Sequence, residues 1–316
     1  MQRLGRHGPA SAGLGAKARL KRLSLAASEA HQLGMQAMLE GYLLLATGLP
    51  KYLSMARNLA ASIRVMDGTR RICLIHDKNA RLEPADARLF DDFAVLTDDP
   101  RYPGFMKKIQ LFPISPFCRT MFVDADCLLV KRDIDKYWDM ARPYPFAITG
   151  SRRTSGEWKG ADIAHLLEQE SAPYLVQMNS GVFCFDKSLE SKVFFEGLNQ
   201  FYLRRREHLG VGLHRGAPAQ TDEIYIGLWM GLNRLDSCGG RDGENSWMVS
   251  TWRAFWMTIN PELGESVLRK PRRSIAGIPN PIGGWDRISP SFVHFVGLKP
   301  SRQYNRLAAY FNAKME

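Results

Sequence analysis

The stretch Thr120-Met121-Phe122-Val123-Asp124-Ala125-Asp126 places two carboxylates, one residue apart, directly after a short apolar run. An apolar run that ends in polar residues is typical of a buried strand. Carboxylates beside such a strand are costly to bury unless another group pairs with them. With one residue between them, both can converge on one hard cation. The stretch therefore predicts a strand with a metal site at its C-terminal end, although an isolated Asp-x-Asp more often forms a turn or a helix cap.

Alternating strand and helix patterns precede this stretch. The predicted strands are 42–46, 71–77 and 93–96, and the predicted helices are 51–66 and 105–112. Strands that alternate with helices imply right-handed βαβ units and a parallel sheet covered on both faces. Ligands bind beyond the carboxyl ends of such strands, which is where Thr47, Asp77 and Asp124 fall.

The C-terminal half of the chain is less regular. Its predicted strands are 146–148, 181–185 and 291–297, and its predicted helices are 188–205 and 222–232. Residues 233–290 carry glycine, proline and four tryptophans with weak periodicity. We predict a Rossmann-like α/β fold with a mostly parallel sheet flanked by helices, in one domain from residue 38 to residue 316.

A basic segment precedes that domain. Residues 1–34 hold six basic residues against Glu29 alone, in a chain of 316 residues with a net charge of +11. The segment has no apolar run long enough for a signal peptide or a membrane span. We predict that residues 1–37 form a disordered basic extension. A transit peptide, or an arm in peripheral contact with an anionic membrane, stays open. Nucleic acid is not expected as a partner, because the basic residues show no aromatic interleaving or recognition motif.

The cysteines indicate a reducing compartment. The five residues have no Cys-x-x-Cys spacing, and most lie among apolar residues, as Cys73 and Cys184 do. This pattern is typical of buried thiols and not of disulfides or a zinc site. We therefore expect a cytoplasmic protein, with or without peripheral membrane contact.

Six ordered segments between Tyr42 and Pro300 together resemble glycosyltransferase family 8, which includes glycogenin and bacterial galactosyl- and glucosyltransferases. The segments are Leu45-Ala46-Thr47-Gly48 with Tyr52, Lys108-Ile109-Gln110-Leu111-Phe112, Phe122-Val123-Asp124-Ala125-Asp126, Asn179-Ser180-Gly181-Val182, Asp222-Glu223 and His294-Phe295-Val296-Gly297-Leu298-Lys299-Pro300. The resemblance implies a GT-A fold, retention of anomeric configuration, and a nucleotide-diphospho-sugar donor, with a UDP-hexose as the expected kind. The acceptor stays open between a glycan, a lipid-linked glycan and a protein.

The resemblance also implies roles for individual residues. A divalent metal, Mn²⁺ or Mg²⁺, is expected on Asp124, Asp126 and His294, and catalytic roles are expected for Asp222 and Glu223. The expected donor-binding residues are Thr47, Tyr52, Lys108, Asp124, Asn179, Ser180, Gly297 and Lys299. A set of nitrogen and oxygen ligands favours Mn²⁺ over Mg²⁺.

Several of these residues also have a purely structural interpretation. His294 could be a hydrogen-bonded core histidine, Tyr52 could pack the first helix, and Asn179 could be a turn residue. Lys108 could lie on a solvated helix face, as the neighbouring Lys107 could.

The sequence departs from the family pattern at two places. The closing segment is one residue short between Gly297 and Lys299, and Ser301 stands where the family has Trp. Glu223 stands where the family has a Gln beneath the anomeric carbon of the sugar. A carboxylate there could be the nucleophile of a covalent route, with its charge stabilised by the start of a helix. It could instead only hydrogen-bond sugar hydroxyls during a front-face displacement.

Two other functions are compatible with parts of the sequence. A non-catalytic sugar-nucleotide binding protein would keep Tyr52 and Asp124 but would not need Asp222 and Glu223. A haloacid-dehalogenase-like phosphatase also has an Asp-x-Asp strand. However, it places that strand near the chain start, and Cys127-Leu128 replaces the Gly-Thr that is usual there.

Overall fold

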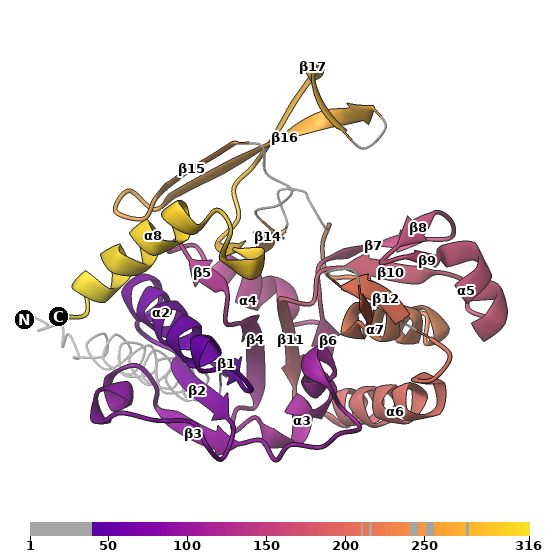
Figure 1. The fold of residues 1–316 in the computed structure, drawn as a ribbon, viewed down its shortest axis with the longest axis horizontal. Coiled ribbons are helices and arrows are strands. Elements are labelled where there is room, and N and C mark those ends of the chain that lie inside the picture. Colours follow the sequence, from indigo (N-terminus) through magenta and orange to yellow (C-terminus); the bar gives the residue numbers. More distant parts are fainter. Residues whose placement is uncertain (1–39, 210, 215–216, 241–245, 251–255, 276–277) are drawn as a thin grey trace, which may run out of the picture. The chain divides into compact units, whose positions relative to one another are not determined.

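The computed structural model describes residues 40–209, 211–214, 217–240, 246–250, 256–275 and 278–316 (Figure 1). The predicted basic extension, residues 1–37, lies outside these residues. None of the described helices is both long enough and apolar enough to cross a membrane.

A six-stranded sheet lies at the centre of the fold, in the strand order β3-β2-β1-β4-β11-β6. Its strands are β1 (Glu40–Ala46), β2 (Arg71–His76), β3 (Asp92–Val95), β4 (Arg119–Asp124), β6 (Phe146–Ala147) and β11 (Val182–Asp186). The strands β1 to β4 are parallel, whereas β11 runs antiparallel to both β4 and β6. The prediction of a mostly parallel α/β sheet is confirmed, with Asp124 as the last residue of a central strand.

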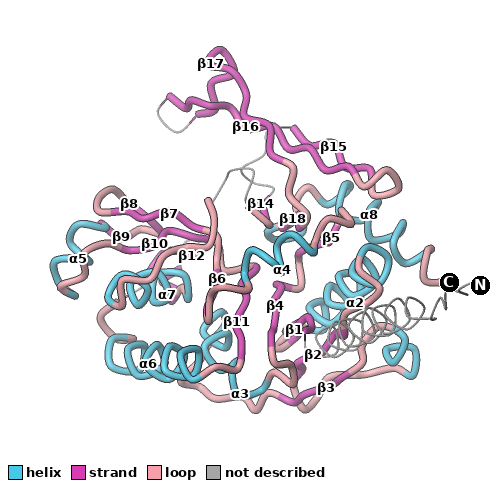
Figure 2. The backbone as a smooth tube through the Cα atoms, turned by 180° about the vertical axis from the view of Figure 1, so that it is seen from behind, coloured by secondary structure: helices cyan, strands magenta, loops and turns pink. Residues whose placement is uncertain are grey.

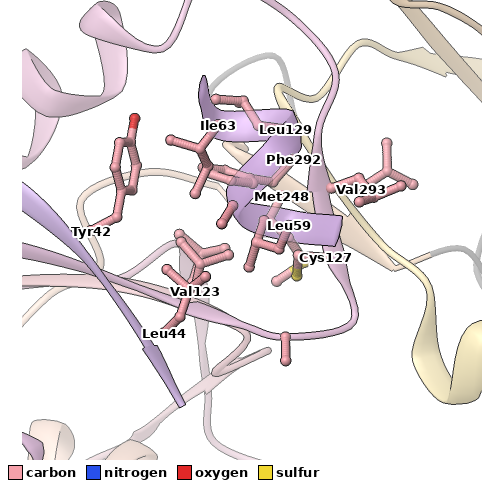
Figure 3. Close-up of a cluster of buried hydrophobic side chains, with 14 of the residues drawn as sticks. Tyr42, Leu44, Leu59, Ile63, Val123, Cys127, Leu129, Met248, Phe292 and Val293 are labelled. Carbon is pink, nitrogen blue, oxygen red and sulfur yellow. The ribbon is translucent and has the colours of Figure 1, made fainter. Parts of the chain in front are cut away.

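Both faces of the sheet are buried, because successive residues of β1 enter two different cores. Leu44 packs in a first core with helix α2 (Pro50–Met66), and Leu43 packs in a second core. Figure 3 shows the first core, which Leu44 shares with Leu59 of the helix. A continuous apolar run is what a strand with two buried faces requires.

Helices cover both faces. Helix α2 lies on one face, and α6 (Leu189–Arg205) and α7 (Asp222–Leu232) lie on the other (Figure 2). The remaining described helices are α3 (Leu111–Ile114), α4 (Asp135–Ala141), α5 (Ile163–Glu170), α8 (Ser301–Ala313) and the 3₁₀ segments η1 (Pro84–Arg88), η2 (Gly104–Gln110) and η4 (Val296–Leu298). Residues 105–112, predicted as one helix, divide between η2 and α3. In a continuous α-helix, Pro113 would clash with the carbonyl group of Ile109.

Two glycines bring α7 directly onto strand β10 (Leu175–Met178). A Cβ atom on Gly231 would lie 1.7 Å from the carbonyl oxygen of Tyr174, and one on Gly227 would lie 2.5 Å from that of Val176. No larger residue allows this approach. The close packing determines where the N-terminal end of α7 lies, and that end carries two of the predicted site residues.

Smaller sheets adjoin the central one. In one of them the order is β14 (Met248–Ser250), β18 (Phe292–His294), β5 (Cys127–Leu129). Strand β10 pairs with β7 (Gly150–Arg153), β8 (Glu157–Trp158) pairs with β9 (Ala161–Asp162), and β12 (Val211–His214) pairs with β13 (Ala217–Gln220). An antiparallel sheet joins β15 (Trp256–Asn260), β16 (Glu265–Ile275) and β17 (Ile278–Ile288). It lies in the region of weak periodicity, where basic residues and prolines obscure any strand alternation.

Candidate functional site

Three distant segments meet beyond the C-terminal end of β4. One is the turn 125–126, which connects β4 to β5. The second is the loop 179–181, in which the Gly181 carbonyl accepts a hydrogen bond of 2.7 Å from the Asp124 N–H. The third is the end of β18, which pairs with β5 so that His294 lies opposite Cys127. The edge where the sequence predicts a ligand site therefore gathers polar residues from far apart in the chain.

Asp126 and His294 form a close pair at this edge. The Oδ1 atom of Asp126 lies 2.9 Å from Nε2 of His294, and Nδ1 of His294 lies 3.2 Å from Oδ1 of Asn179. The Gly181 N–H also donates to that Asn179 oxygen, at 2.9 Å, so the oxygen is the acceptor and Nδ1 bears a proton. Burial lowers the pKa of His294, but the charge and hydrogen bond of Asp126 outweigh burial and the pKa is raised.

The Asp126–His294 pair fits a divalent cation. Adjacent ligands of an octahedral ion with short oxygen or nitrogen bonds are about 3 Å apart, and the two atoms facing each other here are 2.9 Å apart. The contact of Nδ1 with Asn179 is of the kind that orients a metal-bound histidine. The Cys127 thiol belongs to the same group, whose ligand atoms all lie within 4.8 Å of one another. Burial raises the pKa of that thiol well above its ordinary value, and a neutral thiol is a poor ligand for a hard cation.

Asp124 is held by Lys108. The ammonium nitrogen of Lys108 lies 2.9 Å from Oδ2 of Asp124 and 3.5 Å from Oδ2 of Asp222. It also donates to the hydroxyl and the carbonyl oxygen of Ser180, at 3.1 and 3.2 Å. Burial lowers the pKa of Lys108, but the two carboxylates outweigh burial and the pKa is raised. With only 4% of its surface exposed, Lys108 is a buried counter-ion and does not lie on a solvated helix face.

Asp222 and Glu223 begin helix α7, and both are buried. Glu223 Oε1 accepts a hydrogen bond of 3.4 Å from the Ser180 N–H, and its Oε2 lies 2.9 Å from Nζ of Lys159. Burial raises the pKa of Glu223, and the charge of Lys159 opposes this only in part. The position of Glu223 at the N-terminal end of α7 therefore does not by itself determine whether its carboxyl group is ionised. Oδ2 of Asp222 lies near Lys108 but accepts no hydrogen bond from a described residue.

The predicted nucleotide-binding residues lie at the ends of β1 and β2. Thr47 follows β1 directly, at the same sheet edge as the acidic pair. Tyr52 is half-buried and packs against the first core, so packing accounts for part of its position. Asp77 follows β2 and accepts a hydrogen bond from the Gly48 N–H, whereas its buried Oδ1 has no described partner. An unpaired buried oxygen at this edge is what a ligand donor could satisfy.

The closing segment contributes backbone to the site. Gly297 has a φ of 63°, in the left-handed region that favours glycine, and its N–H lies 3.4 Å from Oδ2 of Asp126. Lys299 is exposed just before α8. Its expected contact with the donor stays a prediction, as do the donor-binding role of Lys108 and the metal-ligand role of Asp124.

Two residues of the site could not be recognised from the sequence. Lys159 pairs with Glu223, and the hydroxyl of Ser250 accepts a hydrogen bond of 3.2 Å from the Asn179 side-chain amide. Lys159-Gly160 could have been identified as a turn between two short strands. Nothing in the sequence connects that turn with Glu223, because the contact depends on how α7 packs.

Known proteins resemble this chain in fold and not in sequence. No protein-family model and no curated protein sequence matches the chain. Among solved structures, the galactosyltransferase LgtC in complex with donor and acceptor sugar analogs is similar, with a TM-score of 0.52 and 10% identity over 85% of this chain and 95% of that chain.

Two further glycosyltransferase structures are less similar. The bifunctional WbbM has a TM-score of 0.43 and 12% identity, and the match covers 67% of this chain and 40% of that one. GlyE of Streptococcus pneumoniae TIGR4 has a TM-score of 0.40 and 11% identity, with 63% and 45% covered. The match thus spans less than half of either protein. The likeness to the galactosyltransferase is one of architecture, and this chain has the mostly parallel α/β fold of GT-A glycosyltransferases.

Proposed function

We propose that the protein is a glycosyltransferase that moves a sugar from a nucleotide-diphospho-sugar, such as a UDP-hexose, to an acceptor with retention of anomeric configuration. The observation that carries the proposal is a set of buried and half-buried ionisable side chains gathered at the C-terminal edge of the parallel strands. They are Lys108, Asp124, Asp126, Asp222, Glu223 and His294. Such buried charges are unfavourable for folding alone and are typical of functional sites.

In this proposal Asp126 and His294, together with Asp124, hold Mn²⁺ or Mg²⁺. The bound ion would neutralise the negative charge that develops on the departing diphosphate. The 2.9 Å between Asp126 and His294 and the contact of His294 with Asn179 support the assignment. Lys108 keeps Asp124 and Asp222 from repelling each other before the donor binds.

Asp222 and Glu223 act on the sugar. In a covalent route, a carboxylate oxygen of Glu223 bonds to the anomeric carbon while the bond to the diphosphate breaks. The acceptor hydroxyl oxygen then replaces Glu223, which leaves as a carboxylate, and the hydroxyl proton passes to the released diphosphate. Two inversions give overall retention. In a front-face route, Glu223 only orients the sugar. Oδ2 of Asp222, which no described donor satisfies, can accept a hydrogen bond from a sugar hydroxyl in either route.

A non-catalytic sugar-nucleotide binding protein is the alternative. It would use the same edge of the sheet but would gain nothing from burying Asp222 and Glu223 side by side. Turnover of any donor separates the two functions. The nature of the acceptor, whether glycan, lipid-linked glycan or protein, and peripheral contact with an anionic membrane are further parts of the proposal.

A panel of nucleotide-sugars tests donor binding directly. We expect one donor class, with a UDP-hexose first, to raise the melting temperature of the full chain when Mn²⁺ is present, because a ligand at a hundred times its Kd stabilises a protein by about 2.7 kcal/mol. Asp126→Ala should abolish the Mn²⁺-dependent part of the shift. Asp139→Ala is the matched control, since Asp139 is an exposed residue of α4. The absence of a shift with every donor would contradict the proposal.

A further inference from the structure

The β8–β9 hairpin presents a lysine at its tip. Lys159 and Gly160 form its two-residue turn, and both have positive φ, 53° and 79°. Two positive φ angles are the signature of the hairpin turn that matches the twist of its strands. A lysine in this conformation is uncommon, because side chains other than glycine disfavour it. The hairpin therefore places a long cationic side chain where a glycine or an asparagine would form the turn more easily.

The hairpin is anchored to the same face of α7 that carries Glu223. Trp158, the residue before the turn, is buried, and a Cβ atom on Gly227 would lie 3.3 Å from its ring. Gly227 lies four residues after Glu223, and residues four apart share one face of a helix. Anchoring of Trp158 at Gly227 thus brings Lys159 to the first turn of α7, where its Nζ lies 2.9 Å from Oε2 of Glu223.

The two members of this ion pair differ in burial. Glu223 is 6% exposed, whereas the side chain of Lys159 is 43% exposed. Four groups face the Glu223 carboxylate. Asp222 on its own helix repels it, and Lys108 from η2 attracts it. The Ser180 N–H donates to Oε1. Lys108 is already 2.9 Å from Asp124, so Lys159 forms the only ion pair of Glu223 among the described residues.

We propose that Lys159 is a positioning residue that holds the Glu223 carboxylate in place beneath the donor sugar. Its ammonium fixes Oε2 while the Ser180 N–H fixes Oε1, so the carboxylate has one orientation. Lys159 acts through Glu223 and does not itself contact the reacting atoms. The inference rests on the proposed function for its catalytic consequence, but the placement of Glu223 by Lys159 can be measured without turnover.

The first test needs no activity. Glutamate carboxyl carbons are labelled with ¹³C in the donor-free full chain, and Glu223 is assigned by its absence from the spectrum of Glu223→Gln. In Lys159→Met the midpoint of the Glu223 titration should move up by about one pH unit, because a nearby opposite charge favours the ionised carboxylate by this order. In Lys159→Arg, which keeps a positive charge beside Glu223, the Glu223 midpoint should stay close to its wild-type value. Lys192→Met is the matched control, since Lys192 forms an exposed pair with Glu196 at 3.8 Å. An unchanged Glu223 midpoint in Lys159→Met would overturn the inference.

The second test uses a double-mutant cycle on donor turnover. Lys159→Met should lower kcat about tenfold, with donor affinity nearly unchanged and the acid limb of the pH profile moved to higher pH. In a Glu223→Gln background the same substitution should have almost no further effect, because its target carboxylate is gone. If the losses of kcat in Lys159→Met and Glu223→Gln add up in the double variant, or if Lys159→Met lowers donor affinity alone, Lys159 contacts the substrate directly. Either result would overturn the inference. Wild-type protein inactive toward every donor would count against the proposed function alone, and the titration would then decide on Lys159.

Discussion

At the scale of single residues, Glu223 is the residue that distinguishes the two chemical routes proposed for this site. Burial opposes its charge, and Lys159 and the Ser180 N–H hold its two oxygens. A glutamine at this position would make similar hydrogen bonds without the cost of burying a charge. The covalent route proposed above would use the negative charge of this carboxylate, whereas the front-face route would not require it.

The substitution Glu223→Gln separates the covalent route from the front-face route. It preserves shape and hydrogen bonding but removes nucleophilicity. If Glu223 is the nucleophile, kcat should fall by several orders of magnitude while donor affinity stays nearly unchanged. Steady-state kinetics and donor titration measure the two quantities separately. A variant that works within about tenfold of the wild type would favour the front-face route.

Helix α7 and strand β10 position the site at the scale of elements. The helix approaches the strand only because Gly227 and Gly231 lack side chains. Its N-terminal end carries Asp222 and Glu223. A change in packing at the C-terminal end of the helix should therefore reach the site at the other end.

The substitution Gly231→Ala tests the close packing of α7 on the strand. Its Cβ atom would lie 1.7 Å from the Tyr174 carbonyl oxygen, so helix or strand must move. We expect the free energy of unfolding to fall by about 3 kcal/mol, at the upper end of overpacking effects. Urea denaturation measures the loss. The control Glu196→Ala, at an exposed position of α6, should change stability by no more than about 0.5 kcal/mol. Wild-type stability in Gly231→Ala would contradict the close packing.

A buried polar cluster joins β1, the connection between α2 and β2, and α4, away from the site. The hydroxyl of Tyr42 donates to Asp67 at 2.6 Å, Arg70 lies 2.9 Å from the same carboxylate, and Trp138 donates to the hydroxyl of Tyr42 at 3.3 Å. Burial raises the pKa of Asp67, but Tyr42 and Arg70 outweigh it and the pKa is lowered. A carboxyl group with a lowered folded-state pKa stabilises the fold above its unfolded pKa, and that stability is lost as the pH falls through the folded pKa.

Asp67→Asn should therefore destabilise the protein in a pH-dependent way. At pH 7 the free energy of unfolding should fall by about 3 kcal/mol, since one partner of a buried pair is removed. The difference from the wild type should shrink as the pH falls from about 4, the ordinary pKa of the carboxyl group in the unfolded chain, through the lower pKa of the folded state. Urea unfolding at several pH values measures both. Asp139→Asn, at an exposed position, serves as the control. A difference that is the same at all pH values would contradict the role of the charge.

At the scale of the whole molecule, sequence periodicity predicted the parallel strands and the sheet edge that carries the acidic pair. The run 42–46 and the stretch 120–124 lie in register as neighbours because both are apolar and must be buried on two faces. Segments with a weak alternation of apolar and polar residues do not reveal their strands in the sequence. Strands β15 to β17 lack alternation, and β8 and β9, which flank the Lys159 turn, are two residues each and too short to show any. Burial of Lys108 was also beyond prediction, since it depends on tertiary contacts with Ser180.

The measurement that tests the central claim most directly is release of nucleoside diphosphate from the donor. Wild-type protein is incubated with the donor that gives the largest thermal shift, with Mn²⁺ or with excess chelator. We predict turnover with Mn²⁺, loss of turnover in chelator, and a kcat at least about 10²-fold lower in Asp126→Ala, the scale of losing one electrostatic contact in the transition state. Asp139→Ala should match the wild type. Turnover that persists unchanged in excess chelator, or in Asp126→Ala, would contradict the proposal that the protein is a metal-dependent glycosyltransferase.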